Sequence, residues 1–285
     1  MPGEPPFISK TLKLVSIAIL LATVSIATTA AYSGYEEYGA LTSSVIGSSL
    51  NHLQLAINGS TLSISGLSVP NKMTFPLTLE LLGTVSLNNA TIGTFDSGTY
   101  LIQPNQSQSV NLSIPLSFAG LLKNSQALEA AAINSSLLSI NTTVSAHMVP
   151  LLGINITKAA NTTAGPILGD LSANLNSSGA RLSSDGETLD VPLILSWENT
   201  SPLASGSLWL SGNLTGTPGR PPGNYGTISG PLNFTQGQNR QEFVLQLPVS
   251  DFNGGFPKGS YTFEIALSQS ITSPPFLQIT KSVNV

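Results

Sequence analysis

The chain has 285 residues, with 10 lysine or arginine, 14 aspartate or glutamate, no cysteine and a formal net charge of −4 at pH 7. This balance excludes nucleic-acid binding, which needs a basic face to neutralise phosphates. Without cysteine no disulfide can hold the fold, so one or two domains must be stabilised by buried apolar side chains.

Charged side chains are sparse, at 8% of residues against about 25% in ordinary soluble domains. Acid unfolding works mainly through groups that gain protons, so we expect the protein to tolerate acidic surroundings. The alternative is that the abundant Ser, Thr and Asn side chains serve only to keep the surface soluble.

The first element in chain order is an uncharged apolar run over residues 14–31, with Lys10 and Lys13 before it and Glu36 and Glu37 after it. A helix of this length, at about 1.5 Å per residue, spans roughly 27 Å, which is close to the hydrocarbon thickness of a bilayer. The run therefore predicts a single membrane-spanning helix.

The two lysines orient this helix, because positive charge is retained on the cytoplasmic side. We expect a cytoplasmic tail over residues 1–13, a transmembrane helix over residues 14–32 and a membrane-proximal linker over residues 33–49. All later residues are then outside the cell membrane.

A cleaved secretory signal is the alternative, since Thr29, Ala30 and Ala31 offer small residues to a signal peptidase. The spacing of Tyr32, Tyr35 and Tyr38 favours the retained helix instead, because a tyrosine at every third residue places an aromatic face among the headgroups. Both interpretations export the rest of the chain.

N-glycosylation sequons (Asn-X-Ser/Thr) are the second strong signal. Many of these asparagines occupy polar positions of alternating segments, where a glycan would point to solvent. The alternative is compositional drift in a chain rich in Ser and Thr. The candidate glycosylation sites are Asn58, Asn89, Asn105, Asn111, Asn134, Asn141, Asn155, Asn161, Asn176, Asn199, Asn213 and Asn233.

Beyond residue 39 the hydrophobic pattern has a period of two, which predicts half-buried β-strands. Residues 110–118, 243–249 and 261–267 alternate in this way. Residues 119–133 (AGLLKNSQALEAAAI) are the one clear helical candidate, and we expect this helix to cover a sandwich end. The fold class is therefore all-β, with two tandem Ig-like antiparallel β-sandwiches over residues 50–165 and 167–285.

The exported part contains an internal duplication. Gly93 is followed after 22 residues by Pro115, and Gly226 is followed after the same interval by Pro248. Each copy also has an opening in which a hydrophobic residue is followed by Pro and Leu. These openings are residues 75–77 (FPL) and 191–193 (VPL).

The order of motifs in the first copy resembles the late-embryogenesis-abundant group 2 family, also called the water-stress and hypersensitive-response (WHy) domain. The resemblance covers roughly residues 50–162, and residues 170–270 more weakly. Val69 stands where the family has its first Asn. The motifs are residues 69–72 (VPNK), 75–79 (FPLTL), 85–89 (VSLNN), 92–94 (IGT) and 108–112 (QSVNL).

This resemblance implies a small Ig-like sandwich, often tethered by one N-terminal helix, in proteins that are stress-related or structural. It supplies no catalytic residues. The sequons and the lack of cysteine are similar to cell-surface proteins of archaea.

Residues with catalytic or metal-binding chemistry are few. His52 and His147 are the only histidines, and we expect His147 on the polar side of a strand. Residues 185–190 (DGETLD) are the one acidic cluster, which predicts a solvated turn, with a Ca²⁺ site as the alternative. Trp197 and Trp209 are expected in the core, with a sugar-stacking surface as the alternative.

The sequence therefore predicts a membrane-anchored, N-glycosylated extracellular protein that is structural or interactive, with no enzymatic activity, cofactor or metal. Its expected partners are the membrane and its own N-linked glycans, and no nucleic acid. One alternative is a homo-oligomeric subunit of a surface layer or filament that assembles by strand addition, with residues 277–285 as the donor strand. Another is a carbohydrate- or solute-binding surface module that uses Trp197, Trp209 or Tyr225.

Overall fold

The computed structural model describes residues 25, 35, 36, 39, 54–148, 152–184, 186–203, 205–252 and 258–285. The expected cytoplasmic tail, the expected transmembrane segment apart from Ser25, most of the linker, His52 and Asp185 lie outside these residues. Among the described residues, no helix combines the length and apolar character needed to cross a membrane.

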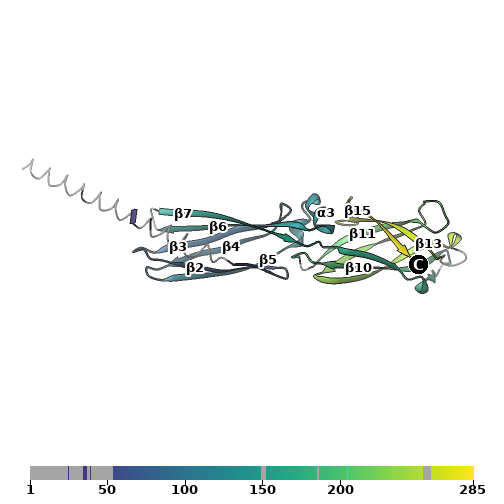
Figure 1. The fold of residues 1–285 in the computed structure, drawn as a ribbon, viewed down its shortest axis with the longest axis horizontal. Helices are drawn as coiled ribbons and strands as arrows, with labels where there is room; N and C mark the ends of the chain where they lie inside the picture. Colours follow the sequence, from purple (N-terminus) through teal and green to yellow (C-terminus); the bar gives the residue numbers. More distant parts are fainter. Residues whose placement is uncertain are drawn as a thin grey trace, which may run out of the picture.

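Two antiparallel sheets form the first sandwich (Figure 1). The three-stranded sheet has the order β1-β2-β5, and the four-stranded sheet has the order β4-β3-β6-β7. The strands are β1 (Gln54–Asn58), β2 (Thr61–Pro70), β3 (Leu77–Leu87), β4 (Ala90–Ile102), β5 (Ser107–Pro115), β6 (Ser136–Met148) and β7 (Leu152–Ala164).

The second sandwich has the strand order β15-β14-β11-β12-β13-β10-β8, with the short β9 paired to β10. Strands β12 and β13 are joined only at the pair Thr227–Gln246, so the arrangement opens there into two layers. The strands are β8 (Gly169–Leu175), β9 (Arg181–Leu182), β10 (Thr188–Asn199), β11 (Ser205–Gly216), β12 (Gly226–Thr235), β13 (Gly237–Pro248), β14 (Ser260–Ser268) and β15 (Pro275–Asn284).

Both sandwiches have one topology. When β1 to β7 are matched in chain order with β8, β10, β11, β12, β13, β14 and β15, the three-stranded order β1-β2-β5 becomes β8-β10-β13, and β4-β3-β6-β7 becomes β12-β11-β14-β15. The chain is therefore all-β and Ig-like, and the sandwich architecture predicted by the alternating sequence is confirmed.

The hydrophobic alternation sets which face of each strand is buried. In β14, Tyr261, Phe263, Ile265 and Leu267 are all buried, while Glu264 between them is exposed. A strand turns successive side chains to opposite faces, so the alternating sequence supplies one core face and one solvated face. Trp197, on the inner face of β10, is among the largest buried side chains.

The glycine–proline spacing has a structural reason. Gly93 pairs with Val85 in the first sandwich, and Gly226 pairs with Leu214 at the matching place in the second. A Cβ atom on Gly226 would lie 2.6 Å from the carbonyl oxygen of Gln246, so glycine allows β12 to approach the end of β13. Pro115 and Pro248 end the matching strands β5 and β13.

Residues 75–77 and 191–193 were expected to be equivalent openings of the two copies. This expectation is wrong, because the two segments occupy different positions in their sandwiches. Pro76 immediately precedes β3, whereas Pro192 lies within β10, the counterpart of β2. The true counterpart of Pro76 is Pro202, which precedes β11. The hydrophobic–Pro–Leu pattern was too short to distinguish a strand from a turn before the next strand.

A buried asparagine builds the turn that follows the second strand in each sandwich. Asn71 accepts a hydrogen bond from the amide of Met73 and donates to the carbonyls of Phe75 and Ile102. Asn199 accepts from the amide of Ser201 and donates to the carbonyl of Leu203. Both asparagines are 1% exposed. Each side chain therefore satisfies backbone groups that the turn removes from the sheet.

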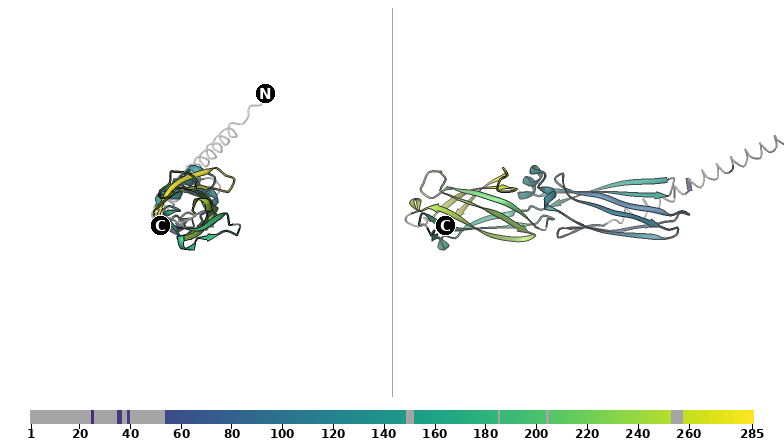
Figure 2. Two further views of the ribbon diagram at one scale, coloured as in Figure 1. Left: turned by 90° about the vertical axis from the view of Figure 1, so that its right-hand side faces the viewer. Right: turned by 180° about the vertical axis from the view of Figure 1, so that it is seen from behind.

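The predicted helix over residues 119–133 is divided into α2 (Phe118–Leu121) and α3 (Ser125–Ile133). Asn124 begins α3 as its N-cap, because its side chain accepts a hydrogen bond from the amide of Ala127. Both helices lie between the two sandwiches, which are arranged in line (Figure 2).

The core of the second sandwich continues through these helices into the near half of the first sandwich, whose far half has a separate hydrophobic cluster. The rings of Phe118 in α2 and Phe234 in β12 meet edge to face, with centroids 4.9 Å apart. The amides of Ile167 and Leu168, in the short connection between the sandwiches, donate to carbonyls of α3 at 2.9 and 2.7 Å. Gln269, near the start of the β14–β15 connection, donates to the carbonyl of Leu122. We call this region the junction.

Candidate functional site

The sequon asparagines lie mainly on the surface of the sandwiches. Ten of the twelve are exposed, Asn176 is half-buried and Asn199 is buried. The exposed ones occupy outward positions of strands or short turns, as the alternation predicts. They are Asn58, Asn89, Asn105, Asn111, Asn134, Asn141, Asn155, Asn161, Asn213 and Asn233.

Asn199 differs from the exposed sequon asparagines, because it is buried at the start of the turn between β10 and β11. Its side-chain nitrogen, the atom that would carry a sugar, donates a hydrogen bond to the carbonyl of Leu203 at 2.9 Å inside the turn. Its oxygen accepts from Ser201. In the folded domain Asn199 is 1% exposed, so this nitrogen is shielded from solvent.

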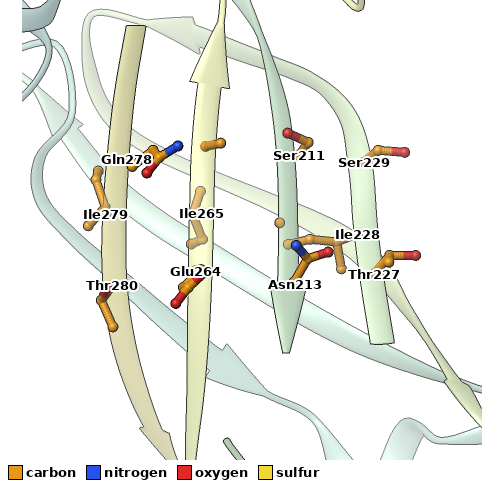
Figure 3. Close-up of a pocket in the computed structure, with 12 residues that line it drawn as sticks. Ser211, Asn213, Thr227, Ile228, Ser229, Glu264, Ile265, Gln278, Ile279 and Thr280 are labelled. Atoms are coloured by element: carbon orange, nitrogen blue, oxygen red, sulfur yellow. The ribbon is translucent and has the colours of Figure 1, made fainter. Parts of the chain in front are cut away.

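The outer face of the sheet β12-β11-β14-β15 carries a depression of about 620 Å³ (Figure 3). The strand register aligns residues of these four strands in three rows that cross the sheet. The rows are Pro231, Trp209, Ser268 and Pro275; Ser229, Ser211, Ala266 and Gln278; and Thr227, Asn213, Glu264 and Thr280.

The depression arises because the middle row consists largely of short side chains. Ser229, Ser211 and Ala266 cover little of the sheet backbone, and the larger Trp209 belongs to the neighbouring row. Gly212, on the opposite side of the strand, leaves space that Ile228 fills. We call this depression the trough. Figure 3 shows the side chain of Asn213 within it.

The three aromatic candidates for ligand binding have different positions. Trp197 is 2% exposed, so it is a core residue and the sugar-stacking alternative is wrong for it. Trp209 is half-buried on the outer face of β11, one row away from the Ser211 row that lines the trough. Tyr225 lies at the far end of the second sandwich, away from the junction.

Tyr225 belongs to a cluster that ties two loops together at this far end, which we call the distal tip. The guanidinium of Arg220 lies 5.8 Å from the ring centroid of Tyr225 and 5.5 Å from that of Phe252. It also pairs with the carboxylate of Asp251 at 3.0 Å. Cation–π contacts and an ion pair at partly exposed positions each contribute modestly, so together they order the loop over residues 217–225.

The remaining candidates form no chemical site. His147 is exposed on the outer side of β6, as predicted. Gly186 has a φ of 75° in the turn before β10, where the acidic cluster was expected to form a solvated turn. In the part of the chain that the structure describes, no group of three or more His, Asp or Glu side chains is placed to hold a metal ion.

The C-terminal segment does not fit the expected donor strand. Residues 275–284 form β15, which pairs with β14 from Ser260–Asn284 to Ser268–Pro275. Its backbone groups facing β14 are already paired and its buried Leu277 and Val283 pack within the same chain, while its other edge ends the sheet. Donation to another subunit would first require this strand to leave its own sandwich.

No protein-family model matches this chain, and a search of curated proteins gave no match. The chain is similar in structure to an exo-chitosanase from Amycolatopsis orientalis (TM-score 0.24, 9% identity, 82% of this chain and 26% of that chain). It is also similar to a glycosyl hydrolase family 2 member from Bacteroides cellulosilyticus (0.26, 7%, 80% and 29%).

A third similar structure is the calcium-binding domain CBD12 of CALX1.1 (TM-score 0.22, 9% identity, 75% of this chain and 76% of that chain). The chain spans less than a third of the length of the two enzymes. Likeness at these TM-scores carries no argument about activity or ligand.

Proposed function

We propose that this chain is a membrane-anchored, N-glycosylated extracellular stem that holds its distal tip at a fixed distance from the cell surface. The observation that carries the proposal is the junction, where one hydrophobic cluster extends from the second sandwich into the near half of the first. The anchor is inferred from the apolar run over residues 14–31, and the glycans are inferred from the exposed sequons.

The junction supports a rigid stem because it contains buried apolar contacts and directed hydrogen bonds. Only residues 165–168 separate β7 from β8, and the amides of Ile167 and Leu168 are bonded to α3. Domains joined by an exposed, polar linker move relative to one another by default, whereas a hydrophobic interface restrains them.

The length of the stem follows from its strands. Strand β6 has 13 residues and β10 has 12, so at about 3.3 Å per residue each sandwich extends roughly 40 Å. Arranged in line (Figure 2), the two sandwiches give a rod on the order of 80 Å long. Sparse charge and outward Asn, Ser and Thr suit a surface that carries glycans.

The decisive experiment is the intact mass and peptide map of the protein extracted with detergent from its native membrane. We expect the mass to include residues 1–31 and glycans on exposed sequons, while Asn199 is unmodified. Protease added to intact cells should remove the two sandwiches and spare the tail. A cytosolic protein with unmodified asparagines would contradict the proposal.

An open side of the first sandwich favours a second candidate function, assembly into a surface layer or filament. β1 and β7 end their sheets, and a mostly apolar depression of about 280 Å³ lies between them beside Ile57, which is 39% exposed. Unpaired strand edges are templates for pairing with another chain. Electron microscopy of the native envelope tests this candidate, since isolated molecules without a lattice or fibre would refute it.

A further inference from the structure

The trough on the second sandwich has chemistry that suits a neutral, hydroxyl-rich ligand. Among the described residues that line it, Glu264 is the single charged one and none is lysine or arginine. Hydroxyl and amide groups of Ser211, Ser229 and Gln278 can both donate and accept hydrogen bonds. An anion would meet only the negative Glu264, and an apolar ligand would leave these polar groups without partners.

Trp209 places an apolar side chain in the row next to this polar floor, just outside the residues that line the trough. It stands in the row next to Ser211, between Pro231 and Ser268 on the neighbouring strands. Indole side chains combine a broad apolar face with a polar edge. A sugar ring has the matching combination, since its C–H groups form an apolar face and its hydroxyls project around the rim. The trough therefore fits a saccharide.

Asn213 indicates that the saccharide would be a glycan attached to this same chain. This asparagine is exposed, lines the trough and begins the sequon Asn213-Leu214-Thr215. A sugar attached to its side chain would begin inside the trough, where Figure 3 places Asn213 between Thr227 and Glu264. Attachment also removes the entropy cost of bringing a separate ligand to the site.

We propose that the trough holds the first sugars of a glycan attached to Asn213, packed across Ser211 toward Trp209. The inference rests on the glycosylation proposed above and goes further, because it makes this glycan an ordered part of the domain. Packed sugars would cover the indole of Trp209, whereas a glycan extending freely into solvent would leave it open.

Oxidative footprinting of the full-length glycoprotein in detergent measures this cover, with the buried Trp197 as an internal reference. We expect Trp209 to be oxidised several-fold faster in Asn213→Gln than in the natural protein. Two matched variants serve as controls. Asn233→Gln removes a sequon from β12 of the same sheet, and Asn155→Gln removes one from β7 of the first sandwich. Both should leave the oxidation of Trp209 unchanged.

All substitutions are at exposed asparagines, so failure to fold is not expected, and unchanged oxidation of Trp197 verifies the fold in each variant. Equal oxidation of Trp209 with and without an occupied Asn213 would overturn the inference. An unmodified Asn213 in a protein that is glycosylated elsewhere would also overturn it. Faster oxidation of Trp209 in Asn233→Gln but not in Asn213→Gln would overturn it as well.

One further arm separates an attached sugar from a free one. Full-length protein made in a host without N-glycosylation is footprinted with and without millimolar N-acetylglucosamine and glucose oligosaccharides. Protection of Trp209 by these probes, together with equal oxidation of the natural protein and Asn213→Gln, would assign the trough to a separate saccharide and overturn the proposed source. Absence of glycan at every sequon would instead contradict the proposed function.

Discussion

The two buried asparagines show how single side chains determine where a strand ends. Asn71 and Asn199 occupy matching turns, and each provides hydrogen bonds that the sheet no longer supplies there. A leucine or an alanine at these positions would bury backbone groups without partners. These asparagines therefore act as structural residues even though one of them begins a sequon.

Asn71→Ala and Asn199→Ala are expected to lower the free energy of unfolding by about 3 kcal/mol each, because each leaves several buried backbone groups unsatisfied. Urea denaturation of the unglycosylated protein measures this loss. Asn174→Ala, at an exposed position of β8 that is not a sequon, should change stability little. A loss at Asn199 no larger than that at Asn174 would contradict the assigned role.

Ionisation of Tyr261 is expected to lower the stability of the fold at alkaline pH. Burial raises the pKa of its phenol above the ordinary value of 10.0, because an apolar environment disfavours the phenolate. The unfolded chain therefore loses this proton at lower pH than the folded chain. The resulting stability is fully present below about pH 10 and is lost as the pH rises through the folded pKa.

Denaturation from pH 8 to pH 11 should consequently show a decline in stability beginning near pH 10. Tyr261→Phe removes the titrating group, so its stability, although different at neutral pH, should decline less steeply over the same interval. Parallel pH profiles for the two proteins would exclude Tyr261 as the source of the decline.

At the scale of elements, close approach between strands depends on glycine. Gly226→Ala would place a Cβ atom 2.4 Å from Cδ2 of Leu247, and overpacking of this kind costs about 1–3 kcal/mol. Gly230→Ala in the same strand meets Phe243 at 3.3 Å, which a small ring movement relieves. Thermal melts should therefore show a lower midpoint for Gly226→Ala than for Gly230→Ala, and equal midpoints would refute the packing argument.

Side-chain amides also replace missing backbone pairing where β12 and β13 separate. Gln241 accepts a hydrogen bond from the amide of Asn233 and donates to the carbonyl of Pro231. Asn239 accepts from the amide of Thr235 and donates to its carbonyl. These two residues of β13 close an edge that is otherwise joined only at Thr227–Gln246. Hydrophobic periodicity in the sequence does not indicate that side-chain hydrogen bonds join these two strands.

The strands and the glycine equivalence could be predicted because both depend on local alternation and on a short repeated motif. The break between α2 and α3 had a readable signal in Asn124, a favourable N-cap residue. The Asn71 and Asn199 turns were missed because their repeat lies between strands, where the spacing differs. The trough could not be predicted, since it requires the register of four strands to align Ser229, Ser211, Ala266 and Gln278 in one row.

At the scale of the whole molecule, the junction makes the sandwiches thermodynamically coupled. We expect the natural protein to unfold in one calorimetric transition and Phe118→Ala to separate it into two, because the variant loses the contact with Phe234 and about 3–5 kcal/mol of core packing. Phe75→Ala, at a position 52% exposed at the opposite end of the first sandwich, serves as the control. Two transitions in the natural protein would show that the junction does not couple the sandwiches.

The sparse charge of the whole chain leads to a second prediction at this scale. With 14 Asp and Glu residues in 285, few groups can bind protons on unfolding, so the protein should remain folded at pH 3. Circular dichroism at pH 3 and pH 7 tests this expectation. Extensive unfolding at pH 3 under conditions where the protein is stable at pH 7 would refute it.

The direction of the last strand has a mechanical consequence. β15 runs from the junction toward the distal tip, and Val285 is bonded there to Gly259. A pull on the C-terminus, directed away from the proposed membrane anchor, is therefore parallel to β15 and tends to slide it along β14. All the hydrogen bonds between these two strands then share the tension together instead of opening one after another. A tethered stem of this design would resist detachment by flow or by a departing neighbour.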